Sequence, residues 1–131
     1  MMKNMQTISD YYLAQGQVWI APVWSCKDRK FKPRPVVIVG NESANDKLDV
    51  VLNFITSQGA RGDFDVELTF RDETGLDVPS WVRTAKTFTI QKSQLRTQMI
   101  EREGVTQPKG YIGRLNEIDL ANVIEMCRLV F

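Results

Sequence analysis

The residues most able to do chemistry lie close together near the start of the chain. Five cations and one acid fall within residues 27–34, and they are Lys27, Asp28, Arg29, Lys30, Lys32 and Arg34. Phe31 lies among them and offers an aromatic face on which a nucleic-acid base can stack. The segment is therefore either a local binding site for a polyanion such as RNA or a solvated loop whose charges aid solubility.

Arg34 differs from its neighbours because it lies between Pro33 and Pro35. Each proline fixes its own φ near about −65°, and Pro35 also disfavours a helical conformation at Arg34. A stiff backbone leaves the planar guanidinium partly preorganised for a phosphate. This favours an anion-binding role for Arg34 over a rigid strand entry alone.

A second candidate segment is FITSQGARGD, residues 54–63. Thr56 and Ser57 end an apolar run, where side chains emerge from a core into a cleft. A hydroxyl there can hydrogen-bond a phosphate oxygen. The alternative is that Thr56 and Ser57 simply begin a turn, as Thr and Ser often do.

A third candidate segment is PSWVRTAKTFTI, residues 79–90, which contains Trp81, Arg83 and Lys86. If Val82 faces the core of a strand, Arg83 faces outwards on the same side as Trp81. An outward Trp and Arg pair is suited to binding bases and phosphates. It is equally suited to binding a partner protein.

The composition limits the chemistry. The chain has 131 residues, a formal net charge of +1 and no histidine, so it lacks the side chain most used for proton transfer near neutral pH. With two distant cysteines and scattered acids, the composition argues against a zinc site. A magnesium site needs only carboxylates and stays open, although no compact acidic cluster is present. No metal and no cofactor are therefore expected. Neither a membrane span nor a secretion signal is present, which favours a cytoplasmic protein.

The elements that must position these residues are mainly strands. Apolar runs and period-two patterns predict strands over residues 17–24, 34–40, 48–56, 64–70, 81–84 and 87–91. A basic loop is expected over 25–33, a short helix over 8–14 within an N-terminal extension 1–15, and a C-terminal helix over 116–131 capped by Asn116. Short connections favour one mainly β domain over 1–131, a small antiparallel SH3-like barrel or half-barrel with that helix packed against it.

Several of these segments occur in the order found in the MazF/PemK family of bacterial toxins, which the sequence resembles from Gly16 to its end. The matching segments are GQVWIAPV, RPVVIVG, VLNFITSQ, GLDVPSWVRTAKTFTIQKSQL and GRLNEIDLANVIEMCRLVF. Each motif is short, and their order and spacing together carry the resemblance.

The resemblance implies a homodimer and the toxin of a type II toxin–antitoxin system. Such a toxin is a metal-independent endoribonuclease that cuts single-stranded RNA, usually mRNA, and leaves a 2′,3′-cyclic phosphate. By the same resemblance, Arg34, Thr56 and Arg83 are the catalytic residues, with Ser57 beside them. The cognate antitoxin is expected to cover the anion cleft with a disordered tail.

Two departures from the family pattern concern proton transfer. The family's PemK branch has Arg-x-Asp at its third site, and Ala85 stands at the Asp position here. The loop that often carries Gly-His-Glu-Gln reads Lys-Asp-Arg-Lys at 27–30. Asp28 and Lys86 are the local alternatives for proton transfer. The N-terminal extension and residues 97–111 have no counterpart in the motifs.

Two other functions remain open at this stage. The same fold family includes CcdB-like toxins that bind DNA gyrase without cutting RNA. A member that has lost catalysis and only binds RNA or a partner protein is the other alternative.

Overall fold

A six-stranded antiparallel sheet curls into a barrel in the computed structural model of the chain, which describes residues 13–41, 44, 49–95 and 99–131. The sheet has the order β4-β5-β3-β2-β1-β8. Its strands are β1 (Gln17–Ser25), β2 (Lys30–Ile38), β3 (Asp49–Thr56), β4 (Asp65–Glu67), β5 (Trp81–Gln91) and β8 (Tyr111–Arg114). The predicted antiparallel barrel with a C-terminal helix is therefore confirmed.

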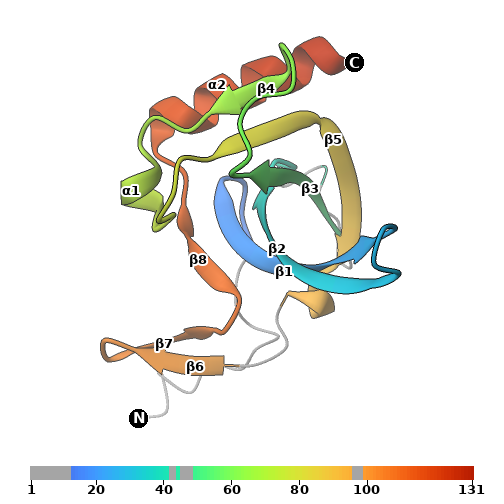
Figure 1. Cartoon of the computed structure of the whole chain (residues 1–131). Coiled ribbons are helices and arrows are strands. Elements are labelled where there is room, and N and C mark those ends of the chain that lie inside the picture. Colours follow the sequence, from blue (N-terminus) through green and yellow to red (C-terminus); the bar gives the residue numbers. More distant parts are fainter. Residues whose placement is uncertain (1–12, 42–43, 45–48, 96–98) are drawn as a thin grey trace.

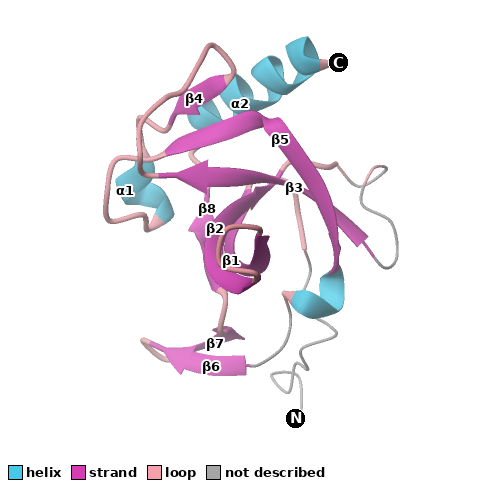
Figure 2. Ribbon diagram, turned by 45° about the vertical axis from the view of Figure 1, so that its right-hand side comes forward, coloured by secondary structure: helices cyan, strands magenta, loops and turns pink. Residues whose placement is uncertain are grey.

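A separate hairpin projects from the barrel (Figure 2). It is formed by β6 (Met99–Arg102) and β7 (Val105–Pro108), within the stretch 97–111 that has no counterpart in the family motifs. A short helix, α1 (Arg71–Thr74), follows β4, and a 3₁₀ turn (Lys92–Gln94) follows β5. The helix expected over 8–14 lies outside the described residues except for Leu13 and Ala14, which are not helical.

The strand β2 shows why the sheet has apolar residues on both faces. Val36, Val37 and Ile38 are all 0% exposed. Successive strand residues face opposite sides, so Val36 and Ile38 pack inside the barrel with Trp19, whereas Val37 packs in a second apolar cluster with Val123. The sheet is thus covered on one side by its own curl and on the other by a helix.

That helix is α2 (Glu117–Val130), which packs on β4 and β5 (Figure 1). The Asn116 side chain accepts the backbone N–H of Ile118 at 2.8 Å, so the predicted cap is confirmed. Asp119 is a buried residue that the sequence pattern did not single out. Its carboxylate accepts the N–H groups of Thr69 and Phe70 at 3.0 and 2.8 Å, which ties the segment after β4 to the helix.

The expected basic loop over 25–33 is wrong, because most of it is strand. β1 and β2 form a long hairpin in which Ser25 pairs with Lys30, so only residues 26–29 turn. Pro22 and Pro33 face each other in this hairpin, where β1 is the one strand that pairs with β2 among the described residues. Proline is tolerated there because its missing N–H costs no ladder bond on the unpaired side.

Two other boundaries differ from the prediction. The runs expected over 81–84 and 87–91 are one strand, β5, with a bulge between them, and the strand expected over 64–70 is only the three residues of β4.

The helix α1 lies so close to β8 that a Cβ added at Gly113 would be 2.1 Å from the carbonyl oxygen of Thr74. In the described part of the chain, no helix is both long and apolar enough to cross a membrane.

Candidate functional site

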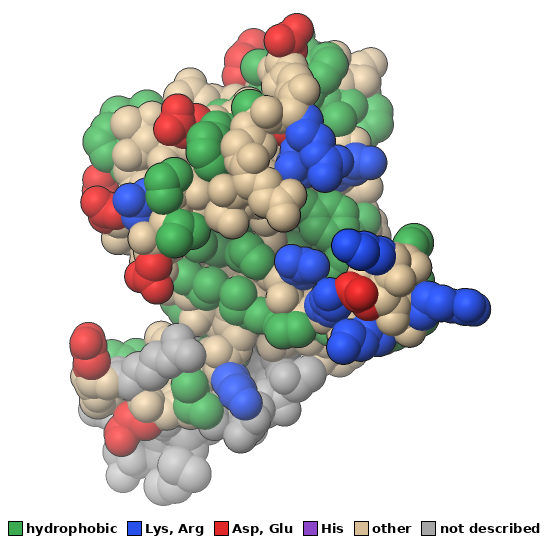
Figure 3. All heavy atoms as spheres, in the orientation of Figure 1, with side chains coloured by type: hydrophobic (Ala, Val, Ile, Leu, Met, Phe, Trp, Pro, Cys, Tyr) green, Lys and Arg blue, Asp and Glu red, His purple; other side chains and the backbone are tan. Residues whose placement is uncertain are grey.

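A cleft of about 510 Å³ opens where β2, β3 and β5 meet the loop after β3. It brings together five of the predicted site residues, which are Arg34, Thr56, Ser57, Arg83 and Lys86. Figure 3 shows Lys and Arg side chains gathered over the β1–β2 hairpin that extends from this region. Segments far apart in the sequence therefore place several cations around one cleft.

Arg34 lies on the exposed part of β2, opposite Ala21 of β1. The buried run of β2 begins two residues later, at Val36. The Arg34 guanidinium makes no hydrogen bond or ion pair with any other described residue. Its donors are therefore available to a ligand in the cleft.

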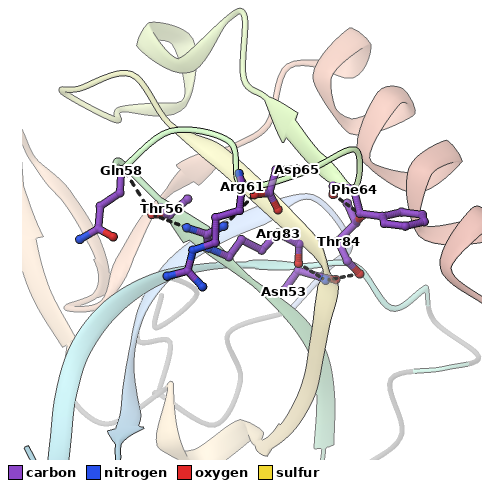
Figure 4. Close-up of polar contacts among 8 residues, drawn as sticks. All are labelled: Asn53, Thr56, Gln58, Arg61, Phe64, Asp65, Arg83 and Thr84. Carbon is purple, nitrogen blue, oxygen red and sulfur yellow. Dashed lines mark hydrogen bonds and ion pairs between the residues drawn. The ribbon is translucent and has the colours of Figure 1, made fainter. Parts of the chain in front are cut away.

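Thr56 is the last residue of β3, and its hydroxyl is held by two donors. The oxygen Oγ1 accepts the N–H of Gln58 at 3.2 Å and Nη2 of Arg83 at 3.4 Å (Figure 4). A hydroxyl has one proton and two acceptor lone pairs. With both lone pairs engaged, the hydroxyl proton is left to donate into the cleft. The bond from Gln58 shows that Thr56 also begins a turn, so the two sequence interpretations hold together.

Arg83 is buried, at 8% exposed, so the expected outward pair with Trp81 is wrong. The period-two pattern correctly places Arg83 and Val82 on opposite faces of β5. However, β4 pairs with this part of β5 and helps to cover Arg83. Nη1 of Arg83 forms an ion pair with Oδ2 of Asp65 at 2.7 Å. Trp81 is half-buried and does not line the cleft.

The backbone around Arg83 is fixed by the buried side chain of Asn53. Arg83 lies opposite Phe54 of β3, whereas Thr87 lies opposite Asn53, so residues 84–86 form a bulge. Nδ2 of Asn53 donates to the carbonyl oxygens of Arg83 and Thr84 at 2.9 and 3.0 Å, and to Oγ1 of Thr87 at 3.1 Å. Lys86 reaches the cleft from this bulge.

The remaining predicted RNA-binding residues lie on the β1–β2 hairpin and do not line the cleft. They are Lys27, Asp28, Arg29, Lys30, Phe31 and Lys32. Trp24, which the sequence did not single out, does line it. Its ring contacts that of Phe31 edge to face, with centroids 5.2 Å apart, although the two residues are 51% and 61% exposed. This aromatic pair joins the cleft to the basic hairpin.

Asp28 is engaged within the hairpin. Its carboxylate accepts a hydrogen bond from Lys32 and another, at 3.3 Å, from the hydroxyl of Ser25. The hydrogen bond from Lys32 is the main cause that lowers the pKa of Asp28 below its ordinary value of 3.8. A carboxylate of low pKa outside the cleft is a poor proton acceptor for chemistry inside it. Of the two residues considered for proton transfer, Lys86 is the one that lines the cleft.

Sequence reasoning also missed Arg61 and Asp65. Arg61 belongs to the loop after β3 and lines the cleft, and its exposed guanidinium has no partner among the residues described here. Figure 4 shows it beside the Arg83–Asp65 pair. The segment GARGD signalled a loop, but no local pattern indicated where the side chains of that loop would lie.

Metal ligands do not gather at this site. Across the described ranges, no group of three or more His, Cys, Asp or Glu side chains is placed to hold a metal ion. The polar side chains that line the cleft are instead cations, hydroxyl groups and the amide of Gln58.

The fold and the cleft together define a small antiparallel β-barrel protein with a positively charged cleft at its strand ends. A family model described as the PemK-like, MazF-like toxin of type II toxin–antitoxin systems matches residues 14–131. The chain belongs to this family, and the resemblance inferred from the motifs is confirmed. No curated protein matches the sequence at a significant level.

Solved structures support the same fold. An endoribonuclease from mycobacterial species has a TM-score of 0.65 at 16% identity, over 92% of this chain and 91% of that one. MazE–MazF from Deinococcus radiodurans gives 0.61 at 15%, over 92% and 96%. The Mycobacterium tuberculosis toxin MazF-mt6 gives 0.57 at 25%, over 88% and 98%. At these identities the likeness is one of fold.

Proposed function

We propose that the chain is the toxin of a type II toxin–antitoxin system and acts as an endoribonuclease on single-stranded RNA, chiefly mRNA. The observation that carries this proposal is the cleft in which Arg34, Thr56 and Arg83 meet from three different strands. Family membership and the fold of a mycobacterial endoribonuclease support it. By cutting mRNA, the protein would stop translation and growth.

The proposed reaction needs no metal. The 2′-OH of one nucleotide loses its proton to a water molecule and attacks the adjacent phosphorus, the bond to the 5′ oxygen breaks, and that oxygen takes up a proton. The products are a 2′,3′-cyclic phosphate and a 5′-OH. Negative charge grows on the phosphoryl oxygens in the transition state, and each preorganised donor aimed at it contributes a factor of about 10²–10³ in rate.

The cleft residues fit these requirements. Arg34 has free donors at the rim, Arg83 is fixed at the floor, and Thr56 has a hydroxyl proton to donate. These three are proposed to bind the scissile phosphate. Lys86 lines the same cleft and is proposed to protonate the leaving 5′ oxygen.

The β1–β2 hairpin is proposed to hold the rest of the RNA strand. Its exposed Trp24 and Phe31 rings offer faces for unpaired bases, and Lys27, Arg29 and Lys30 lie near them to contact phosphates. Stacking combined with a basic surface is the usual way in which proteins bind single-stranded nucleic acid.

The proposed toxin acts in the cytoplasm as a homodimer and is held inactive by a cognate antitoxin. The MazE–MazF structure from Deinococcus radiodurans, which shares the fold, supports the last point. A cation-lined cleft suits a disordered antitoxin tail that carries acidic residues.

A cleavage assay in EDTA tests the proposed function. Purified protein is incubated with single-stranded RNAs of varied sequence, and the cut sites are mapped by primer extension. We expect cleavage in EDTA, with a loss of about 10²–10³ in rate for Arg34→Ala and an unchanged unfolding transition. Arg128→Ala is the matched control, because Arg128 is exposed on α2 and forms only a surface ion pair with Glu125.

Two results would count against the proposal. RNA left intact across many sequences would refute an endoribonuclease. RNA binding that survives Arg34→Ala, with no cleavage by either protein, would instead indicate a member of the family that has lost catalysis.

A further inference from the structure

The ion pair between Asp65 and Arg83 joins two strands beside the cleft, which Arg83 lines. The side chains of Arg83 and Asp65 are only 10% and 8% exposed, and Nη1 and Oδ2 are 2.7 Å apart. The two residues are direct partners across the β4–β5 ladder. Oδ2 of Asp65 also accepts the backbone N–H of Arg61 at 2.7 Å. One carboxylate oxygen therefore ties together a strand arginine and the loop that carries a second arginine.

The position of Asp65 is itself fixed. Thr84, next to Arg83 on β5, donates both its backbone N–H and its hydroxyl to the carbonyl oxygen of Phe64, the residue before Asp65. These bonds hold the start of β4 against β5 (Figure 4). Asp65 thus meets Arg83 from a backbone that cannot shift independently.

The pair leaves Arg83 with donors to spare. A guanidinium has five N–H donors, of which one meets Asp65 and one meets Thr56. An arginine held by two partners has already given up most of its rotamer freedom, so it loses less conformational entropy on binding a phosphate than a free arginine does. The remaining donors are available to a ligand in the cleft.

We infer that Asp65 is the positioning residue for Arg83. Its carboxylate, which comes from β4, takes the place of the carboxylate that Ala85 of β5 lacks. This inference rests on the proposed endoribonuclease function and assigns Asp65 no contact with RNA. Asp65 acts through Arg83, by fixing the orientation in which the guanidinium meets the scissile phosphate.

A double-mutant cycle tests the inference. Values of kcat and KM are measured for the wild type, Asp65→Ala, Arg83→Ala and the double variant, on one RNA oligonucleotide in EDTA. We expect Asp65→Ala to lower kcat about tenfold to a hundredfold, because a misplaced catalytic group loses that much, and to change KM little. The double variant should be no slower than Arg83→Ala alone, because Asp65 acts only through Arg83.

Two further variants separate positioning from folding. Asp65→Asn keeps the size and an acceptor oxygen, so it should recover part of the rate that Asp65→Ala loses. Asp63→Ala, an exposed acid in the same loop, should cleave at the wild-type rate. Removing one partner of a buried ion pair can prevent folding. Each rate is therefore measured well below the unfolding midpoint of that variant, and Asp65→Asn carries the test if Asp65→Ala does not fold.

The outcomes are distinct. Folded Asp65→Ala that cleaves like the wild type, or Asp65→Asn that is no faster than folded Asp65→Ala, would refute the inference and leave the proposed function intact. If only Asp65→Asn folds, a loss that persists in the Arg83→Ala background would refute the inference too. So would losses that multiply in the double variant, because they would show that Asp65 acts independently of Arg83. Intact RNA with the wild-type protein would refute the proposed function, and this inference with it.

Discussion

The amide of Asn53 offers a sharp test of how the cleft is built, because Asn53→Asp replaces its hydrogen-bond donor with an acceptor oxygen of nearly the same size. Asn53 is 0% exposed, and its Nδ2 donates to the carbonyl oxygens of Arg83 and Thr84 and to Oγ1 of Thr87. Asn53→Ala removes all three bonds and leaves buried acceptors in the bulge of β5. Asn53→Asp keeps the shape but turns a carboxylate oxygen towards two carbonyl oxygens.

The lost hydrogen bonds determine how far each variant lowers the free energy of unfolding. A buried group left without its partner costs about 1–3 kcal/mol, so Asn53→Ala should lower the free energy of unfolding by about 2–4 kcal/mol. For a chain of this length, that corresponds to a fall in Tm of roughly 6–16 °C. Asn53→Asp should be worse at neutral pH, because its buried charge faces two acceptors.

The pH dependence has a definite sign. Burial and the facing carbonyls raise the pKa of the introduced carboxyl above its unfolded value of about 3.9. Below the unfolded pKa the carboxyl is protonated in both states and can donate one hydrogen bond to a carbonyl. As the pH rises through the folded pKa, this stability is lost. Asn53→Asp should therefore be less stable at pH 8 than at pH 5, relative to the wild type.

Urea unfolding followed by the fluorescence of buried Trp19 measures these differences at both pH values. Asn116→Asp is the matched control. Asn116 caps α2 through its oxygen, which an aspartate retains, and the bond from its Nδ2 to Glu73 is exposed to solvent, so that variant should lose less than about 1 kcal/mol at either pH. If Asn53→Asp is as stable as the wild type, or equally destabilised at pH 5 and pH 8, the account of the bulge is wrong.

Two further predictions concern other parts of the fold. Gly113→Ala should lower the free energy of unfolding by about 1–3 kcal/mol, because the new Cβ would be 2.1 Å from the carbonyl oxygen of Thr74. Gly62→Ala, where an added Cβ meets nothing within 4 Å, should be neutral in the same urea titration. Lys32→Met should raise the pKa of Asp28 towards 3.8, as followed by a carboxyl NMR titration, with Lys30→Met as the control. A carboxyl whose pKa is lowered by folding stabilises the folded state at pH values above its unfolded pKa. This stabilisation is lost as the pH falls through the folded pKa. In Lys32→Met, this dependence of stability on pH should therefore disappear. An unshifted Asp28 in Lys32→Met would show that another group lowers its pKa.

The core of the fold could be predicted because its signals are local. Val36, Val37 and Ile38 are apolar in succession, which indicates a strand buried on both faces, and the cap and apolar period of α2 are equally direct. The outer half of β2 could not be predicted in this way. It is charged and contains Pro33, so it has the composition of a loop, although it pairs with β1 as a strand.

The candidate site divides similarly. Family motifs indicated Arg34 and Thr56, and the period of β5 placed Arg83 on the correct face of its strand. Nothing local indicated that Arg83 would be buried, because its cover comes from pairing with β4. Asp65 lies 18 residues before Arg83, and their register depends on tertiary contacts that a sequence pattern does not record.

The change in burial along β2 has a consequence for amide hydrogen exchange. Residues Val36–Ile38 lie between β1 and β3, whereas residues 30–34 have β1 alone and a largely exposed surface. Amides in the inner part should therefore exchange only on global unfolding, and those in the outer part through local opening of the hairpin. Arg34 lies where these two regimes meet. A ligand that contacts both the cleft and the hairpin would extend slow exchange outwards past Arg34, so the amide exchange rates of residues 30–32 and 34 report directly whether the cleft is occupied.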